Sequence, residues 1–96
     1  MTSSHDFKKD KRNNQIKIYV DGKYLFRKNA KISVFDSGFL LGDGIWTSIR
    51  LHQNKLLFLN DHIARIYDDA KAISLKIPYT KEKFKKIISK TIKINK

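Results

Sequence analysis

Two residues with the chemistry to bind an anion, His62 and Arg65, lie three positions apart in a segment with helical periodicity. Residues at this spacing share one face of a helix. The pair lies near the amino end, where the helix dipole favours negative charge. Asp61 and Asp69 flank Arg65 at i−4 and i+4, so a surface ion-pair ladder explains the same pattern. The spacing therefore leaves two interpretations of Arg65 open, an anion ligand and an ion-pair partner.

Other chemistry-bearing patterns are weaker. Gly42, Asp43 and Gly44 form a flexible turn that can present backbone N–H groups to a phosphate, but they lack the spacing of the established phosphate-binding loops. A simple turn between strands is the competing interpretation. No serine has a nearby His–Asp pair, and the three histidines show no metal-ligand spacing. The sequence therefore predicts neither a catalytic residue nor a metal site.

The formal net charge of +12 raises nucleic acid as a partner. Most of the excess lies in residues 71–96, which hold nine basic residues and one acidic residue. The lysines of residues 81–93 interleave with apolar residues at helical spacing, which is typical of the solvated face of an amphipathic helix. This segment contains no arginine, and aromatic residues do not alternate with its lysines. We therefore expect no nucleic-acid partner.

Compartment and size follow from composition. The chain has 96 residues and no cysteine, which fits one small domain in the reducing cytoplasm. No apolar run approaches the roughly 18 residues of a membrane span, so no membrane association is expected. Residues 1–14 are polar and charge-dense, and we predict that they form a disordered leader rather than a signal peptide.

Residues 16–58 are predicted to consist mainly of strands. Apolar residues alternate from Ile16 to Val20, and Asp21-Gly22 is a strong signal for a two-residue hairpin turn before residues 23–26. A second extended stretch is expected over residues 30–35. A further strand pair is expected over residues 45–51 and 55–58.

Two helices follow. Residues 61–75 carry apolar residues at i, i+3, i+4 and i+7, with Asn60 as the expected N-cap. After Pro78, Thr80 is expected to cap a second helix over residues 81–93. The sequence thus predicts an α+β fold, an antiparallel sheet of hairpins with two helices packed on one face.

Four segments, in this order and spacing, resemble the amino-terminal domain of class IV aminotransferases. They are residues 18–23 (IYVDGK), 30–39 (AKISVFDSGF), 41–46 (LGDGIW) and 57–67 (LFLNDHIARIY). The resemblance extends in register over residues 16–96. It implies an enzyme of pyridoxal phosphate fold type IV, a group that includes branched-chain and D-amino-acid transaminases.

The resemblance also implies roles for single residues. Arg65 matches the family arginine that binds the cofactor phosphate, and His62 matches the histidine that precedes it. Trp46 matches an aromatic residue of the substrate pocket, and Gly44 belongs to the tight loop before it. Thr47 stands where the family usually has Glu, which changes the charge beside the pocket and leaves the substrate class open.

In the family, the lysine that holds the cofactor covalently lies in a larger second domain, which is expected beyond Lys96. Residues 15–96 are therefore expected to be an amino-terminal domain that is inactive by itself. The full-length protein is expected to be a cytoplasmic homodimer that moves amino groups between an amino acid, of the branched-chain type, and a 2-oxo acid. The alternative is a non-catalytic domain that binds an acidic partner through its basic C-terminal helix.

Overall fold

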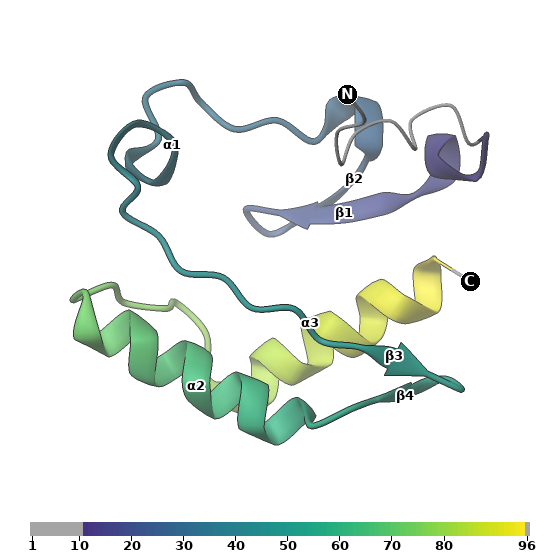
Figure 1. Cartoon of the computed structure of the whole chain (residues 1–96). Coiled ribbons are helices and arrows are strands. Elements are labelled where there is room, and N and C mark those ends of the chain that lie inside the picture. The colour runs from purple at the N-terminus through teal and green to yellow at the C-terminus, as the bar shows by residue number, and fades with distance from the viewer. Residues whose placement is uncertain (1–10, 96) are drawn as a thin grey trace, which may run out of the picture. The chain divides into compact units, whose positions relative to one another are not determined.

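The computed structural model describes residues 11–95 (Figure 1). The chain divides into two compact units. The first unit combines Met1–Ile32 with Ile88–Lys96, and the second is Ser33–Ile87. Both strands and helices are present, so the predicted α+β class is confirmed. Most of the predicted leader, residues 1–10, lies outside the described residues. Its last residues belong to a short 3₁₀ helix, Lys11–Gln15.

The first unit is built on the predicted hairpin. Strand β1 (Lys17–Val20) pairs antiparallel with β2 (Lys23–Phe26). Asp21 and Gly22 have φ values of 49° and 85°, the positive values that a type I′ turn requires. Tyr19 and Tyr24 face each other across the strands, with ring centroids 5.1 Å apart in an edge-on arrangement. The turn therefore sets the register that brings these aromatic rings together.

Asn95 joins the carboxyl-terminal segment of this unit to the hairpin. Its Oδ1 accepts a hydrogen bond from the Lys17 N–H at 2.8 Å, and its Nδ2 donates to the Lys17 carbonyl at 2.9 Å. Nδ2 also donates to the carbonyl of Thr91 at 2.8 Å. The side-chain amide thus satisfies both backbone groups of one β1 residue, as a neighbouring strand would.

The second unit is organised by helix α2 (Leu59–Ala72), which buries Ile63, Ile66 and Ala70 at i, i+3 and i+7. The helix begins two residues before the predicted start and ends three residues before the predicted end. The expected cap at Asn60 is wrong, because the N-cap position is Phe58, in the left-handed conformation and without a side-chain cap. Tyr67 ties α2 to the following loop, because its hydroxyl donates to the Tyr79 carbonyl at 2.6 Å.

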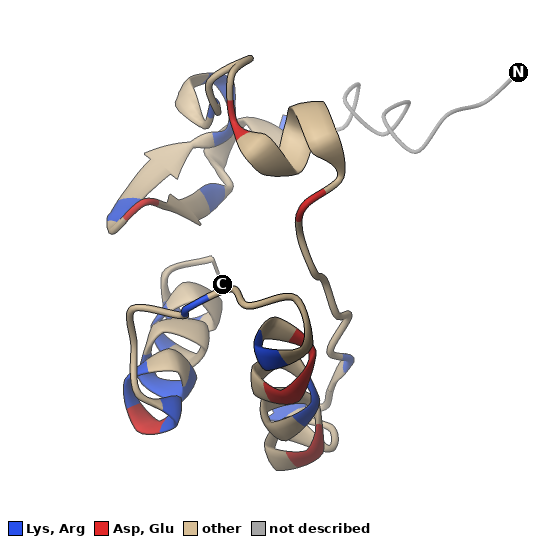
Figure 2. Ribbon diagram, turned by 90° about the vertical axis from the view of Figure 1, so that its left-hand side faces the viewer, with Lys and Arg blue, Asp and Glu red and all other residues tan. Residues whose placement is uncertain are grey.

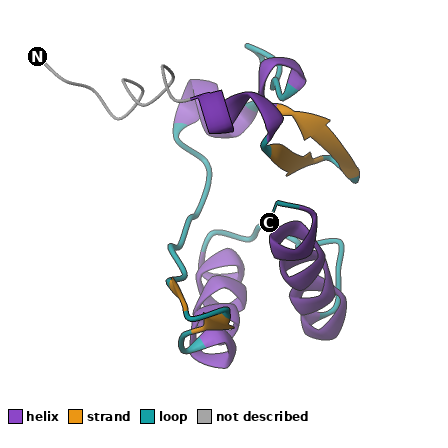
Figure 3. Cartoon of the chain, turned by 90° about the vertical axis from the view of Figure 1, so that its right-hand side faces the viewer, coloured by secondary structure: helices purple, strands orange, loops and turns teal. Residues whose placement is uncertain are grey.

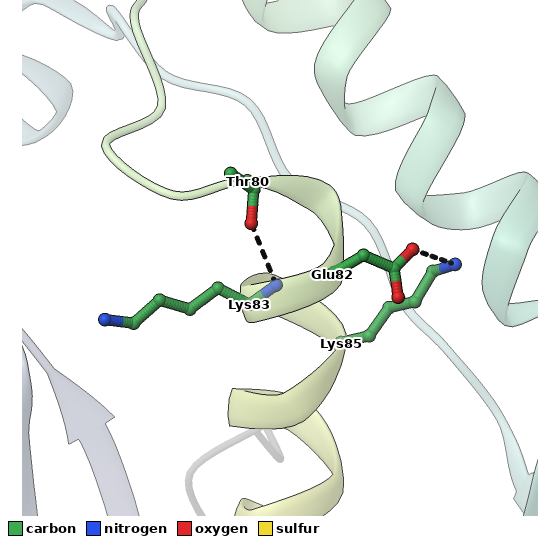
Figure 4. Close-up of polar contacts among 4 residues, drawn as sticks. All are labelled: Thr80, Glu82, Lys83 and Lys85. Atoms are coloured by element: carbon green, nitrogen blue, oxygen red, sulfur yellow. Dashed lines mark hydrogen bonds and ion pairs between the residues drawn. The ribbon is translucent and has the colours of Figure 1, made fainter.

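Helix α3 (Lys81–Ile94) matches its predicted range within one residue. Thr80 caps it as expected, because the Thr80 Oγ1 accepts a hydrogen bond from the Lys83 N–H at 3.1 Å (Figure 4). Glu82, the one acidic residue of α3, pairs with Lys85 at 3.4 Å. The other charged residues of the helix are lysines, coloured blue in Figure 2. Residues 81–87 of α3 belong to the second unit and the remainder to the first.

Several α3 lysines have aromatic partners. The Nζ atom of Lys81 lies 5.6 Å from the centroid of the Tyr67 ring, and that of Lys83 lies 5.7 Å from the Tyr79 ring. In the first unit, the Lys90 Nζ lies 5.2 Å from the Tyr24 ring. Cation–π contacts of this kind stabilise a helix against its neighbours. These lysines therefore contribute to internal packing as well as to surface charge.

Strand content is lower than predicted (Figure 3). The second hairpin forms with Gln53 and Asn54 at positive φ, but its strands are only β3 (Leu51–His52) and β4 (Lys55–Leu56). Residues 45–50 have no facing strand among the described residues. The strands form two separate two-stranded sheets. The extended stretch expected over residues 30–35 is also not a strand.

A short helix that the sequence pattern did not predict, α1 (Ser37–Leu41), follows this stretch. Asp36 caps it by accepting a hydrogen bond from the Phe39 N–H at 3.2 Å. Gly42 ends it in the left-handed conformation at φ 67°. The signals were present as an Asx cap and a C-terminal glycine, but five residues are too few to show a helical period.

Membrane-spanning helices are absent from residues 11–95, since none combines the necessary length and apolarity. The same residues contain no group of three or more His, Cys, Asp or Glu side chains that could hold a metal ion.

We predict that Tyr67→Phe lowers the free energy of unfolding by about 1 kcal/mol at pH 7, because it removes the hydrogen bond to Tyr79. Burial raises the pKa of Tyr67 above its ordinary value of 10.0, because the phenolate is poorly solvated there. The unfolded chain therefore loses this proton at lower pH than the folded chain does. Stability from the neutral phenol is full below about pH 10 and is lost as the pH rises through the folded pKa.

Urea unfolding of both proteins at neutral and alkaline pH tests this prediction. The alkaline loss of stability should be smaller in Tyr67→Phe than in the parent chain. An identical pH dependence in the two proteins would show that Tyr67 does not carry the effect.

Candidate functional site

The candidate site lies in the second unit, where the segment before β3 meets the first turn of α2. Thr47 Oγ1 and His62 Nδ1 are 3.0 Å apart in a part-buried hydrogen bond that joins residues 15 positions apart. The His62 N–H donates to the Phe58 carbonyl at 3.0 Å, which fixes the backbone that carries the ring. The structure thus brings Thr47, a predicted substrate-binding residue, into contact with His62, the histidine that precedes the predicted cofactor-binding residue Arg65.

The Thr47 hydroxyl and the His62 ring can exchange roles in this bond. When Nδ1 carries no hydrogen the hydroxyl donates to it, and when Nδ1 is protonated it donates to the hydroxyl oxygen. Both arrangements hold the ring in one orientation. A carboxylate at position 47 would place a negative charge beside the ring, whereas Thr47 supplies an uncharged hydroxyl.

This bond was not predicted, although its signals are in the sequence. Burial alternates from Gly44 to Arg50, with Thr47 on the same inward side as Ile45 and Ile49. The period-two pattern of residues 45–51 therefore already placed Thr47 toward the core. Its partner could not be identified, because the pairing of a strand with a helix is not local in sequence.

Arg65 is exposed on α2. Within residues 11–95 its guanidinium forms no ion pair, so the ladder with Asp61 and Asp69 is not present. The negative charges of the two aspartates reduce the positive potential around Arg65, but their carboxylates do not bind the N–H groups of its guanidinium. A guanidinium in this state offers its planar fork to an external anion such as phosphate.

The amino end of α2 adds to the attraction for an anion. No side chain caps this end, because Phe58 occupies the N-cap position and cannot accept a hydrogen bond. The first-turn N–H groups therefore lack their usual side-chain acceptor. Arg65 lies on the same helix, about two turns from this end.

The loop between Gly42 and Gly44 has a structural role. The Gly42 N–H donates to the Gly38 carbonyl at 3.1 Å as α1 ends, and the Gly44 N–H donates to the Gly42 carbonyl at 2.9 Å. A Cβ added at Gly44 would meet only the Gly38 Cα, at 4.0 Å, so packing in this chain does not require glycine there. The contacts within this chain would therefore allow a larger residue at position 44.

Trp46 is 83% exposed, on the opposite side of the segment from Thr47. The structure thus does not bring Trp46 to His62 or Arg65. A groove of about 460 Å³ lies along the second half of α2 and the loop after it, between Tyr67 and Ile77. None of the predicted site residues lines this groove.

We predict that Thr47→Val, which keeps the side-chain shape and removes the hydroxyl, lowers the free energy of unfolding by about 0.5–1.5 kcal/mol. Ser48→Ala is the matched control, because Ser48 is adjacent, exposed and makes no hydrogen bond within residues 11–95. Denaturant unfolding measures the difference, and NMR of the imidazole nitrogens reports the His62 tautomer. Equal stability of the two variants would show that the bond is not formed in solution.

Comparison with known proteins places the chain in a family. The family model for amino-transferase class IV matches residues 44–96. A Methanocaldococcus jannaschii protein named, provisionally, a branched-chain-amino-acid aminotransferase is 42% identical over 80 residues. D-alanine aminotransferases of Listeria monocytogenes and Staphylococcus haemolyticus are 34% and 32% identical over 80 and 79 residues. These matches cover 82–83% of the chain, which spans 28% of the length of each relative. The chain therefore belongs to the class IV aminotransferase family.

Proposed function

We propose that the chain is the amino-terminal part of a pyridoxal phosphate-dependent transaminase, in which Arg65 holds the phosphate of the cofactor. The observation that carries the proposal is the exposed guanidinium of Arg65, which makes no ion pair within residues 11–95 although Asp61 and Asp69 flank it. Arg65 also lies within the residues that the family model matches.

The residues present fit a phosphate group. An unpaired guanidinium and the uncapped amino end of α2 both favour a dianion. When bound, pyridoxal phosphate supplies the electron sink that lets an amino group move between an amino acid and a 2-oxo acid. The chain's own contribution is to grip the phosphate through Arg65 and to hold the ring of His62 in place through Thr47.

Trp46, Gly44 and Thr47 are proposed as residues on the substrate side. The family match covers all three. Trp46 offers a large apolar face and Thr47 a neutral hydroxyl, which suits an apolar amino-acid side chain better than a charged one. A branched-chain substrate is proposed on this ground and on the name of the archaeal relative.

The covalent cofactor lysine is proposed to lie in polypeptide outside this chain, which spans 28% of its relatives' length. We propose that the complete protein is a homodimer. We also propose that it is cytoplasmic, because the chain has no cysteine. The 96-residue chain itself is expected to show no transaminase turnover with added cofactor, beyond the rate of a matched solution of free lysine amines.

We predict that Arg65→Lys weakens the binding of pyridoxine 5′-phosphate to this chain about tenfold or more, because the bidentate contact is lost while the charge is kept. This probe lacks the aldehyde, so it cannot react with the many lysines. Arg50→Lys is the matched control, because Arg50 is an exposed arginine of the same unit that does not belong to α2. Calorimetric titration compares the three proteins.

Equal affinity in the Arg65 and Arg50 variants would remove Arg65 from the site. Inorganic phosphate, titrated in parallel, separates recognition of the phosphate from recognition of the ring. An affinity that depends on salt but on neither arginine would indicate attraction by the net charge alone.

A further inference from the structure

The hydrogen bond between Thr47 and His62 uses only one of the two ring nitrogens of the histidine. Nδ1 is the atom that meets the Thr47 Oγ1, at 3.0 Å. Within residues 11–95 the other nitrogen, Nε2, has no hydrogen-bond partner. No buried side-chain nitrogen or oxygen lacks a partner in this part of the chain, so Nε2 is not enclosed by the residues around it. The ring is therefore held at one nitrogen and able to bind at the other.

The hydroxyl of Thr47 decides which nitrogen carries the hydrogen. A neutral imidazole has one N–H and one bare nitrogen, whereas a hydroxyl can donate as well as accept. Thr47 has no other hydrogen-bond partner among the described residues, so its hydrogen is satisfied only when it is donated to Nδ1. The opposite arrangement would leave a part-buried donor without an acceptor, which is costly. The favoured neutral ring therefore has a bare Nδ1 and a hydrogen on Nε2.

A hydrogen on Nε2 makes the ring a donor close to Arg65. His62 and Arg65 are three positions apart on α2, so they are neighbours on the helix surface, with Cβ atoms about 5–6 Å apart. A phosphate ester has three terminal oxygens, and a guanidinium fork occupies two of them. One oxygen is left for a second donor. A bare Nε2 would instead bring a lone pair toward that oxygen and repel it.

We propose that His62 is a second ligand for the phosphate that Arg65 binds, and that Thr47 is the positioning residue that keeps the hydrogen on the Nε2 of His62. This inference rests on the function proposed above. One charged fork and one neutral donor hold the anion, so the ring binds without having to gain a proton. Because binding and tautomer are linked, the phosphate in turn favours the donation from Thr47 to Nδ1.

Nitrogen NMR of the unmodified chain tests the tautomer directly. At about pH 8 an ordinary imidazole is neutral, and the chemical shifts of its nitrogens report which one carries the hydrogen. His62 should show the hydrogen on Nε2. His52, an exposed residue of β3 whose ring has no described hydrogen bond, should show a mixture of both tautomers. Adding pyridoxine 5′-phosphate should shift the Nε2 signal of His62 more than its Nδ1 signal and leave His52 unchanged.

Two substitutions at position 62 separate the roles of the ring nitrogens. His62→Gln places an amide N–H near the position of Nε2 and should keep the affinity for pyridoxine 5′-phosphate within about twofold. His62→Asn places its amide near Nδ1 and should weaken binding about tenfold, which corresponds to one hydrogen bond to a charged group. Thr47→Val frees the tautomer and should give an intermediate loss. His52→Asn is the matched control and should leave the affinity unchanged.

The outcomes distinguish this inference from the function on which it rests. Loss of affinity in Arg65→Lys but not in His62→Asn would keep Arg65 as the phosphate ligand and overturn the role of His62. A hydrogen on Nδ1 of His62 would overturn the role of Thr47. Equal losses in His62→Gln and His62→Asn would mean that the ring acts only through packing, which also overturns the inference. Unchanged affinity in every variant, Arg65→Lys included, would overturn both proposals.

Discussion

Burial of one stripe of α2, made of Ile63, Ile66 and Ala70, is the interaction on which the second unit depends. These three residues form the buried core that the structure shows within residues 11–95. Such a small core leaves little hydrophobic stabilisation to hold the surrounding loops. Individual polar contacts therefore matter more than they would in a larger domain. The Tyr67 bond to Tyr79 and the Thr47 bond to His62 each fix a segment that has few buried residues of its own.

The same stripe determines what the site presents to solvent. Because Ile66 faces inward, its neighbour Arg65 must face outward, and His62 lies at the boundary between the two sides. Phe58 begins the helix with a strained left-handed backbone and no cap. An N-cap such as serine or aspartate would satisfy the first turn internally. The amino end of α2 instead has no side-chain cap.

Local signals predicted the local elements well. Asp21-Gly22 fixed the first hairpin, Thr80 marked the start of α3, and the apolar period of residues 63–70 identified the core. The failures concern interactions that sequence periodicity cannot show. Asn60 has a side chain suited to an N-cap, but the helix begins before it. Residues 45–50 show the alternating burial of a strand, and no strand in the described part of the chain pairs with them. For the site, the sequence predicts that Arg65 lies on the exposed face of the helix. It does not predict that Arg65 forms no ion pair with Asp61 or Asp69, because that depends on side-chain conformations.

The Asn95 link to Lys17 spans 78 residues of sequence and has a consequence for the order of events during synthesis. A ribosome makes the chain from the amino end, so the hairpin of residues 17–26 emerges long before Asn95 does. The second unit is continuous in sequence and can fold as soon as Ile87 is released. The first unit must wait for residues 88–95. During that interval an isolated two-stranded hairpin is marginally stable at best, so the nascent chain folds from its middle outward.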